Sequence, residues 1–171
     1  AFLAAYVRAH HVLFSGYELR IHHDNAIYHG SWGAELHALA REGFVHLVHV
    51  PTRPGQGACE KMLWRLLPAF DPDVQVVFCR DVDSLPTWRE RLIAEEFIAS
   101  KHPLGVIHDN ISHAGMMGGL CHVDARAFRE VLGYQTFAEF VDAAGFDDAK
   151  WNQHGSDQEW LNQLVERFPS I

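Results

Sequence analysis

Two aspartates spaced one residue apart, Asp81 and Asp83, are the residues of this sequence best suited to chemistry. They follow an apolar, β-branched run that begins at Val74 and is typical of a buried strand in an α/β sheet. An extended backbone sends alternate side chains to the same side, so both carboxylates are expected to face one point. Two carboxylates held together are costly unless a cation lies between them. Because oxygen ligands suit Mg²⁺ or Mn²⁺, the pattern predicts a divalent metal site that holds a phosphorylated substrate.

Other polar residues lie near strand ends. His108, Asp109 and His113 follow a second predicted strand, and ligands of α/β sheets bind beyond the carboxyl ends of strands. These side chains could therefore face the aspartates across a cleft, or they could be structural residues of a loop. Arg80, directly before the first aspartate, could pair with a phosphate or neutralise the carboxylates.

The last predicted helix, residues 156–168, contributes a third candidate, Asp157. Ser156 and Glu159 have the form of a capping box, a hydroxyl residue followed three positions later by glutamate. Asp157 lies four residues before Leu161 on the predicted buried stripe, so its carboxylate is expected to point inward at the helix N-terminus. There it could bind substrate hydroxyls or a developing cation, or it could only cap the helix.

The elements that must position these residues alternate along the chain. Strands are predicted at 18–24, 45–50, 74–80, 104–108 and 116–123, and helices at 1–13, 30–43, 58–70, 87–100, 137–144 and 156–168, with a further short helix starting at 124. Alternation of this kind predicts one α/β domain over residues 1–171: a mostly parallel, Rossmann-like sheet with helices on both faces. Because the chain opens inside a helix without a cap, we expect the first strand of that sheet to be missing by N-terminal truncation.

Composition narrows the classes of partner. The 171 residues carry a formal charge of -8, which argues against a nucleic-acid-binding surface, and no apolar run reaches the roughly 20 residues of a membrane span. The three cysteines are far apart and form no CxxC pair, which favours a reducing compartment such as the cytoplasm. The thirteen histidines show no helical zinc spacing with a third ligand nearby, and most are interpreted as surface or hydrogen-bonded polar residues.

Several segments together resemble a GT-A fold glycosyltransferase. They are R-D-V-D-S at 80–84 with T-W-R-E after it, H-D-N-I-S-H at 108–113, M-G-G-L at 117–120 and S-D-Q-E-W-L-N at 156–162. The D-x-D is similar to that superfamily's metal and sugar-nucleotide motif, and D-Q-x-x-L-N is similar to a segment that many retaining members place against the donor sugar. The resemblance implies a UDP- or GDP-sugar donor, a Mn²⁺ or Mg²⁺ ion and sugar transfer to a hydroxyl of an acceptor that the sequence leaves open.

The resemblance also implies roles for individual residues. Asp83 would bind the metal directly, Asp81 would bind the metal or the donor ribose, and Asp157 would be the catalytic carboxylate beside the donor sugar. The residues expected to contact the donor are Arg80, Asp81, Asp109, Gly118, Gly119 and Gln158. Many members have a histidine metal ligand near the C-terminus, whereas no histidine follows Asp157 here.

Two other functions remain open from the sequence. A haloacid-dehalogenase-like phosphatase also places D-x-D after an apolar strand, with Asp81 as nucleophile and Asp83 as acid/base. That motif usually opens its domain and is followed by Gly-Thr, and neither feature is present here. The other alternative is a non-catalytic domain that binds nucleotide or carbohydrate, and the aspartate turn could also be a solvated loop.

Overall fold

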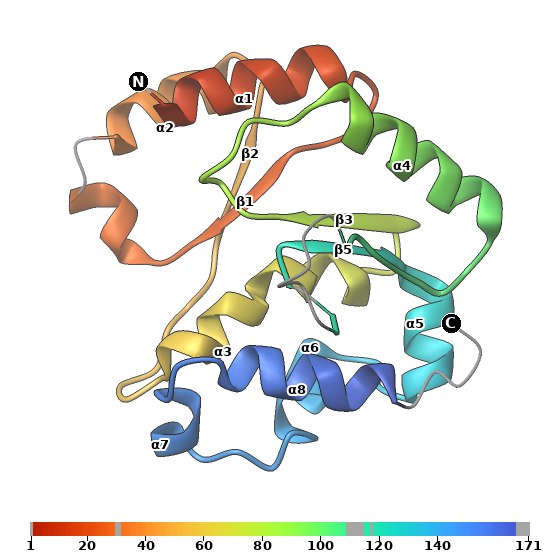
Figure 1. Ribbon diagram of the computed structural model, residues 1–171. Helices are drawn as coiled ribbons and strands as arrows, with labels where there is room; N and C mark the ends of the chain where they lie inside the picture. Colours follow the sequence, from red (N-terminus) through yellow and green to blue (C-terminus); the bar gives the residue numbers. More distant parts are fainter. Residues whose placement is uncertain (1, 30–31, 109–114, 117, 167–171) are drawn as a thin grey trace. The chain divides into compact units, whose positions relative to one another are not determined.

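The computed structural model describes residues 2–29, 32–108, 115–116 and 118–166 (Figure 1). The chain forms two compact units. Unit 1 comprises residues 1–53 and 82–93, and unit 2 comprises residues 54–81 and 94–171. Among the described helices, none is long and apolar enough to cross a membrane.

Unit 1 is built on a two-stranded parallel sheet. β1 (Arg20–His23) pairs with β2 (His46–His49) along the whole length of both strands. The 3₁₀ helix η1 (Asn25–His29) follows β1, and α1 (Phe2–Leu13) lies beside α2 (Gly33–Arg41) (Figure 1). The buried core of this unit consists of Ala4, Tyr6, Val7, Ile27, Leu36, Leu39 and Val45.

Unit 2 contains a three-stranded antiparallel sheet in the order β3 (Val76–Arg80), β5 (Leu120–Asp124), β4 (Leu104–Val106). β5 pairs antiparallel with both neighbours, so β3 and β4 run parallel to each other on either side of it. The central residues of β5, from Cys121 to Val123, are all buried, as expected for a strand covered on both faces.

The prediction of a single, mostly parallel, Rossmann-like sheet is therefore wrong. The described strands form a parallel pair and a separate antiparallel sheet of three. β3 and β4, which are joined through α4 (Trp88–Ser100), run parallel to each other but are separated by β5. The prediction failed at β5, which runs antiparallel to its neighbours. An apolar run indicates that a strand exists, but the direction of the strand depends on its backbone pairing with distant residues.

The helices of unit 2 supply most of its core. They are α3 (Ala58–Met62), the 3₁₀ helix η2 (Leu63–Phe70), α5 (Ala125–Leu132), α6 (Phe137–Asp142), α7 (Asp148–Trp151) and α8 (Ser156–Val165). The single helix predicted over 58–70 becomes 3₁₀ in its second part, which contains Pro68, a residue without a backbone N–H. Asp124 caps α5 by accepting a hydrogen bond from the Ala127 N–H, and Gly133 ends the helix in the left-handed conformation.

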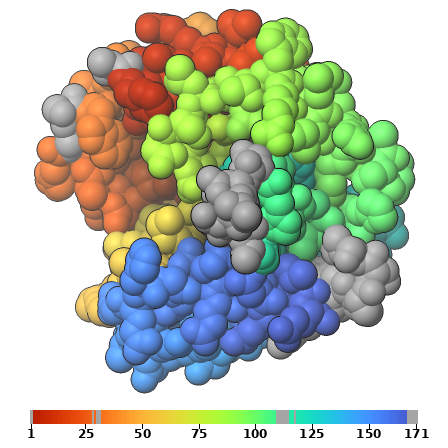
Figure 2. Space-filling view, in the orientation of Figure 1, coloured from red at the N-terminus to blue at the C-terminus, as the bar shows by residue number. Residues whose placement is uncertain are grey.

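For the helix that follows the aspartates, α4 (Trp88–Ser100), the residues Thr87 and Glu90 predict a capping box. Helical spacing predicts an apolar face made of Trp88, Leu92, Ile93 and Phe97. Its capping box is present, since the Glu90 N–H donates to Thr87 Oγ1 and the Thr87 N–H donates to a Glu90 carboxylate oxygen. The predicted apolar face is wrong at its first half, because Trp88 is 67% and Leu92 61% exposed. Phe97 is buried as predicted, and Ala94, which was not predicted, is buried as well; the green surface of α4 is visible in Figure 2.

Candidate functional site

Three chain segments meet at one edge of the unit 2 sheet. Asp81 directly follows β3, His108 follows β4 by two residues, and the pair Gly118–Gly119 directly precedes β5. Arg80 pairs with Leu120, so the amino end of β5 lies beside the carboxyl end of β3. The antiparallel insertion of β5 thus brings the glycine pair to the aspartate. We call this group, Asp81 with Gly118 and Gly119, the aspartate–glycine edge.

Asp81 is held in place from two sides. The Arg65 guanidinium donates a hydrogen bond of 2.8 Å to Asp81 Oδ1, and this arginine side chain is only 15% exposed. On the other side the carboxylate lies against Gly119, where a Cβ atom would come within 2.7 Å of Asp81 Oδ1 and closer still to Oδ2. The Asp81 side chain nevertheless stays 50% exposed. A positioned and half-exposed carboxylate of this kind can meet a cation or a sugar hydroxyl.

Helix α8 holds the loop before β5 through two amide side chains on one face. Asn162 Oδ1 accepts a 2.8 Å hydrogen bond from the Met116 N–H, and Gln158 Oε1 accepts a 3.4 Å hydrogen bond from the Gly118 N–H. Asn162 also lies so close to Gly115 that a Cβ there would be 2.9 Å from its Cγ. Gln158 Nε2 is buried without a hydrogen-bond partner among the described residues. Neither of the two N–H donors of this amide therefore has an acceptor among the described residues beside the glycine pair.

Asp157 is half-buried on the first turn of α8, next to the buried stripe rather than within it. The capping box predicted at Ser156 is wrong, because Gly155, in the left-handed conformation, is the N-cap. The Ser156 side chain is buried and donates to the carbonyl oxygens of Lys150 and Gln153, at 2.5 and 2.9 Å. Its hydroxyl faces the preceding turn, so it does not accept from the first helical N–H groups.

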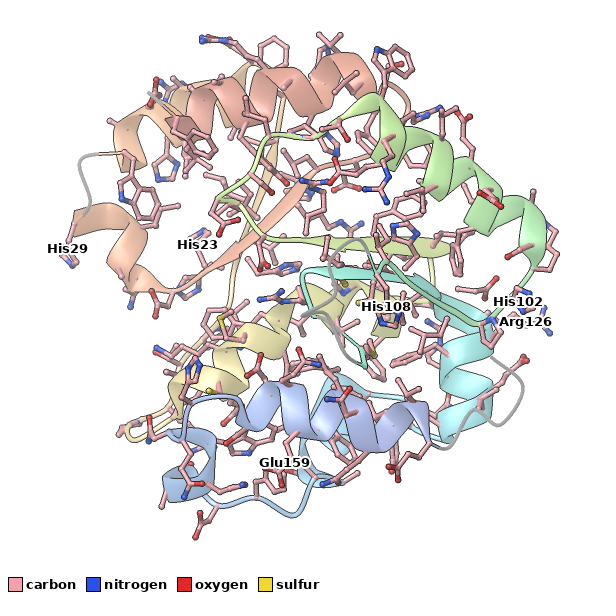
Figure 3. The ribbon with its side chains drawn as sticks, viewed as in Figure 1. His23, His29, His102, His108, Arg126 and Glu159 are labelled. Atoms are coloured by element: carbon pink, nitrogen blue, oxygen red, sulfur yellow. The ribbon has the colours of Figure 1, made fainter. Side chains whose placement is uncertain are left out.

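The remaining residues that the sequence predicted for the site are less closely associated with the aspartate–glycine edge. Arg80 is half-buried at the end of β3, and Asp83 is exposed. The boundary between the two units falls between Asp81 and Val82, so Asp83 belongs to unit 1. The predicted donor residue Asp109 lies outside the described residues. His108 is described, and its Nε2 lies 2.6 Å from the Gly115 carbonyl oxygen (Figure 3).

The carboxylate oxygens of Asp81 are of the ligand type that hard divalent cations prefer. In the described part of the chain, no group of three or more His, Cys, Asp or Glu side chains could hold a metal ion. Mg²⁺ and Mn²⁺ are often bound by only one or two carboxylates, with water and substrate phosphates completing the shell. The ion pair with Arg65 involves Oδ1 of the half-exposed Asp81 carboxylate.

Two thiols lie just behind this edge. Cys79 on β3 faces Cys121 on β5, and both are buried. A hydrogen bond with Cys79, together with burial, raises the pKa of the Cys121 thiol well above its usual range. Since both thiols are buried and Cys121 stays protonated near neutral pH, we interpret the pair as small packing residues behind the edge.

Arg65 is the site residue that sequence reasoning missed. It lies in an apolar run, between the buried residues Trp64 and Leu66. A single charged residue inside such a run was the available signal, because a buried arginine generally needs a carboxylate or carbonyl partner. Its Nε donates to the Met62 carbonyl oxygen at 2.7 Å, which orients the guanidinium toward Asp81.

Comparison of the chain with protein-family models, with curated proteins and with solved structures finds no match. The chemistry available at the aspartate–glycine edge is therefore the main guide to function. It combines an acidic side chain, a mostly buried guanidinium, a glycine turn and side-chain amide groups.

Proposed function

We propose that this protein is a metal-dependent glycosyltransferase that moves a sugar from a UDP- or GDP-sugar to an acceptor hydroxyl. The observation that supports it most is the convergence of Asp81, the glycine pair 118–119 and Gln158 in unit 2. These residues are far apart in the sequence and belong to three of the segments that resemble glycosyltransferases. A chance D-x-D in a solvated loop would have no reason to place Asp81 against the glycine pair, which α8 in turn contacts through Gln158.

Each group has a role in this proposal. Asp81 would hold Mn²⁺ or Mg²⁺, which when bound neutralises charge on the departing nucleoside diphosphate. Arg65 lies 3.4 Å from the place of a Cβ on Gly118, so its positive charge faces the same glycine turn. Glycines let a phosphate or sugar approach the backbone closely, and Gln158 has an amide nitrogen available for a hydroxyl.

The first test is thermal unfolding of the chain with Mn²⁺ and a panel of UDP- and GDP-sugars. A ligand that binds only the folded state raises the midpoint temperature. At a ligand concentration of one hundred times the dissociation constant, it adds about 2.7 kcal/mol to the free energy of unfolding. We expect a Mn²⁺-dependent rise for one nucleotide class, lost in Asp81→Asn. Asp73→Asn, which changes an exposed aspartate of unit 2, is the matched control and should keep the rise. A rise that survives the Asp81→Asn substitution would contradict the proposal, as would the absence of a rise with every donor.

A second prediction concerns Arg65. Arg65→Met keeps the length of the side chain but removes the charge beside Asp81, so donor turnover is expected to fall about 10- to 100-fold, within the range of losing one charged transition-state contact. Stability should change by only about 1 kcal/mol, because Asp81 is half-exposed to water. Arg126→Met is the control, since Arg126 forms an exposed pair with Glu130 (Figure 3). Equal turnover by the two variants would exclude a role for Arg65.

A further inference from the structure

Helix α8 contacts the loop before β5 through three side chains on one face. Leu161 and Asn162 follow Gln158 by three and four residues, so all three lie close together on the helix surface. Gln158 and Leu161 meet the loop at Gly118, whereas Asn162 meets it at residues 115–116. We propose that Asn162 is a positioning residue, which fixes this loop and through it the aspartate–glycine edge. Its effect on turnover rests on the proposed glycosyltransferase function, whereas its contact with the loop does not.

Asn162 contacts two successive residues of the loop. Its Oδ1 accepts a hydrogen bond of 2.8 Å from the Met116 N–H, so the amide oxygen is turned toward the backbone. The same side chain fills the space beside Gly115, where a Cβ atom would lie 2.9 Å from Asn162 Cγ and 3.2 Å from Nδ2. Gly115 also has a φ of 74°, in the left-handed region that glycine adopts without strain. A glycine at 115 therefore lets Asn162 approach the loop closely.

The same loop is held from β4 by His108. His108 Nε2 lies 2.6 Å from the Gly115 carbonyl oxygen (His108 is labelled in Figure 3). Because a carbonyl oxygen can only accept, Nε2 carries the proton and donates it. Gly115 is therefore tied both to the strand side of the edge and to α8. We call His108, Gly115, Met116 and Asn162 the loop clamp.

The position of the loop matters for Asp81 because Gly119 and Asp81 are in contact. A Cβ atom on Gly119 would come within 2.7 Å of Asp81 Oδ1, so the carboxylate has little room on that side. If the clamp is released, we expect the glycine pair to shift and the Asp81 carboxylate to lose its fixed position. Groups that orient a metal ligand change metal affinity or activity by about 10- to 100-fold when they are removed.

The first experiment compares two substitutions of Asn162 in Mn²⁺-dependent turnover of the donor found by thermal unfolding. Asn162→Leu removes the acceptor oxygen at similar side-chain size, so turnover is expected to fall about 10- to 100-fold. The Mn²⁺ concentration that gives half-maximal turnover should rise as well, which a residue that only stabilises the fold would not cause. Asn162→Asp keeps an acceptor oxygen for the Met116 N–H and should restore most of the turnover.

Asn152→Leu is the matched control. Asn152 Oδ1 accepts a hydrogen bond of 3.3 Å from the Ala58 N–H, the same kind of bond in another part of unit 2. Its loss should leave the turnover of the folded chain and the Mn²⁺ requirement unchanged. Circular dichroism confirms that each variant is folded.

A double variant shows whether Asn162 acts through Asp81. In the Asp81→Asn background, adding Asn162→Leu should lower the residual turnover by less than about 3-fold, because coupled residues are not additive. Full multiplication of the two losses would overturn the positioning role, as would equal turnover by Asn162→Leu and the parent chain. Equal losses in Asn162→Leu and Asn162→Asp would overturn it too.

Amide hydrogen exchange at Met116 tests the clamp without any turnover. Exchange should become about 10-fold faster or more in Asn162→Leu and stay near the parent rate in Asn162→Asp, because the bonded N–H opens more often without its acceptor. Unchanged exchange in Asn162→Leu would overturn the clamp itself. A parent chain with neither a midpoint rise nor turnover would instead overturn the proposed function and the role of Asn162 in it, whatever the exchange rates.

Discussion

Replacing Gly119 with alanine is expected to lower donor turnover about 100-fold while the chain stays folded. An added methyl group would overlap the Asp81 carboxylate, so that side chain must leave its position between the glycine and Arg65. Displacing a reacting or metal-binding group by about 1 Å can cost a hundredfold in rate. The folding cost is smaller, about 1–2 kcal/mol, because Asp81 is half-exposed and can turn toward solvent.

Gly118→Ala is the matched control for this prediction. Its added Cβ would meet the Leu161 side chain at 3.2 Å and Arg65 at 3.4 Å, which needs only small movements, and its N–H to Gln158 remains. The free energy of unfolding should therefore change little, so Gly118→Ala controls for the folding cost of an added methyl group at this turn.

A stability measurement tests the same geometry without any assumption about function. In the Asp81→Ala background the clash is gone, so adding Gly119→Ala should cost almost nothing further in the free energy of unfolding. An unreduced cost in the double variant would show that the carboxylate is not what crowds Gly119.

Gly57→Ala is expected to destabilise unit 2 by about 3 kcal/mol, the upper part of the range for overpacking. A Cβ there would lie 2.6 Å from the carbonyl carbon of Trp151 and 2.7 Å from its oxygen. Backbone atoms cannot rotate away as a side chain can. Two hydrogen bonds also fix the position of residues 58–59 relative to residues 152–153, so the backbone cannot easily move away from Trp151. Asn152 Oδ1 accepts from the Ala58 N–H, and the Cys59 thiol donates to the Gln153 carbonyl oxygen.

The measurement is chemical denaturation followed by tryptophan fluorescence, with Gly145→Ala as the control. Gly145 has a φ of 66° but open space around its Cβ position, so only backbone strain applies, about 1 kcal/mol. Thermal midpoints should fall by about 6–12 °C for Gly57→Ala. If the two variants are equally destabilised, crowding at Trp151 is not the cause.

Local patterns in the sequence were sufficient to predict the elements. Apolar runs and breaker residues located all five described strands and most helices, because strand and helix formation depend on neighbours close in sequence. The Thr87–Glu90 capping box was predicted correctly for the same reason, since all its hydrogen bonds lie within one turn. Gln158 and Asn162 are four residues apart, which places them on one face of a helix, and both contact the loop before β5.

Long-range pairing decided what local patterns could not. The apolar content of β5 indicates a buried strand whichever way it runs, and only its hydrogen bonds to β3 and β4 make it antiparallel and central. That direction is also what brings Gly119 to Asp81. The exposed side chains of Trp88 and Leu92 show the same dependence on tertiary structure. Helical spacing predicts which residues share a face of the helix, but it does not predict whether another element covers that face.

The sequence alone therefore determined which residues could do chemistry and in which elements they lie. Tertiary structure alone decided their partners, such as the Arg65 guanidinium beside Asp81. Spacing in the chain carries no information about such a pair, since Arg65 and Asp81 are brought together by a turn and a strand. The physical reason is that a side chain's charge and shape are local properties, whereas its neighbours are set by the packing of the whole unit.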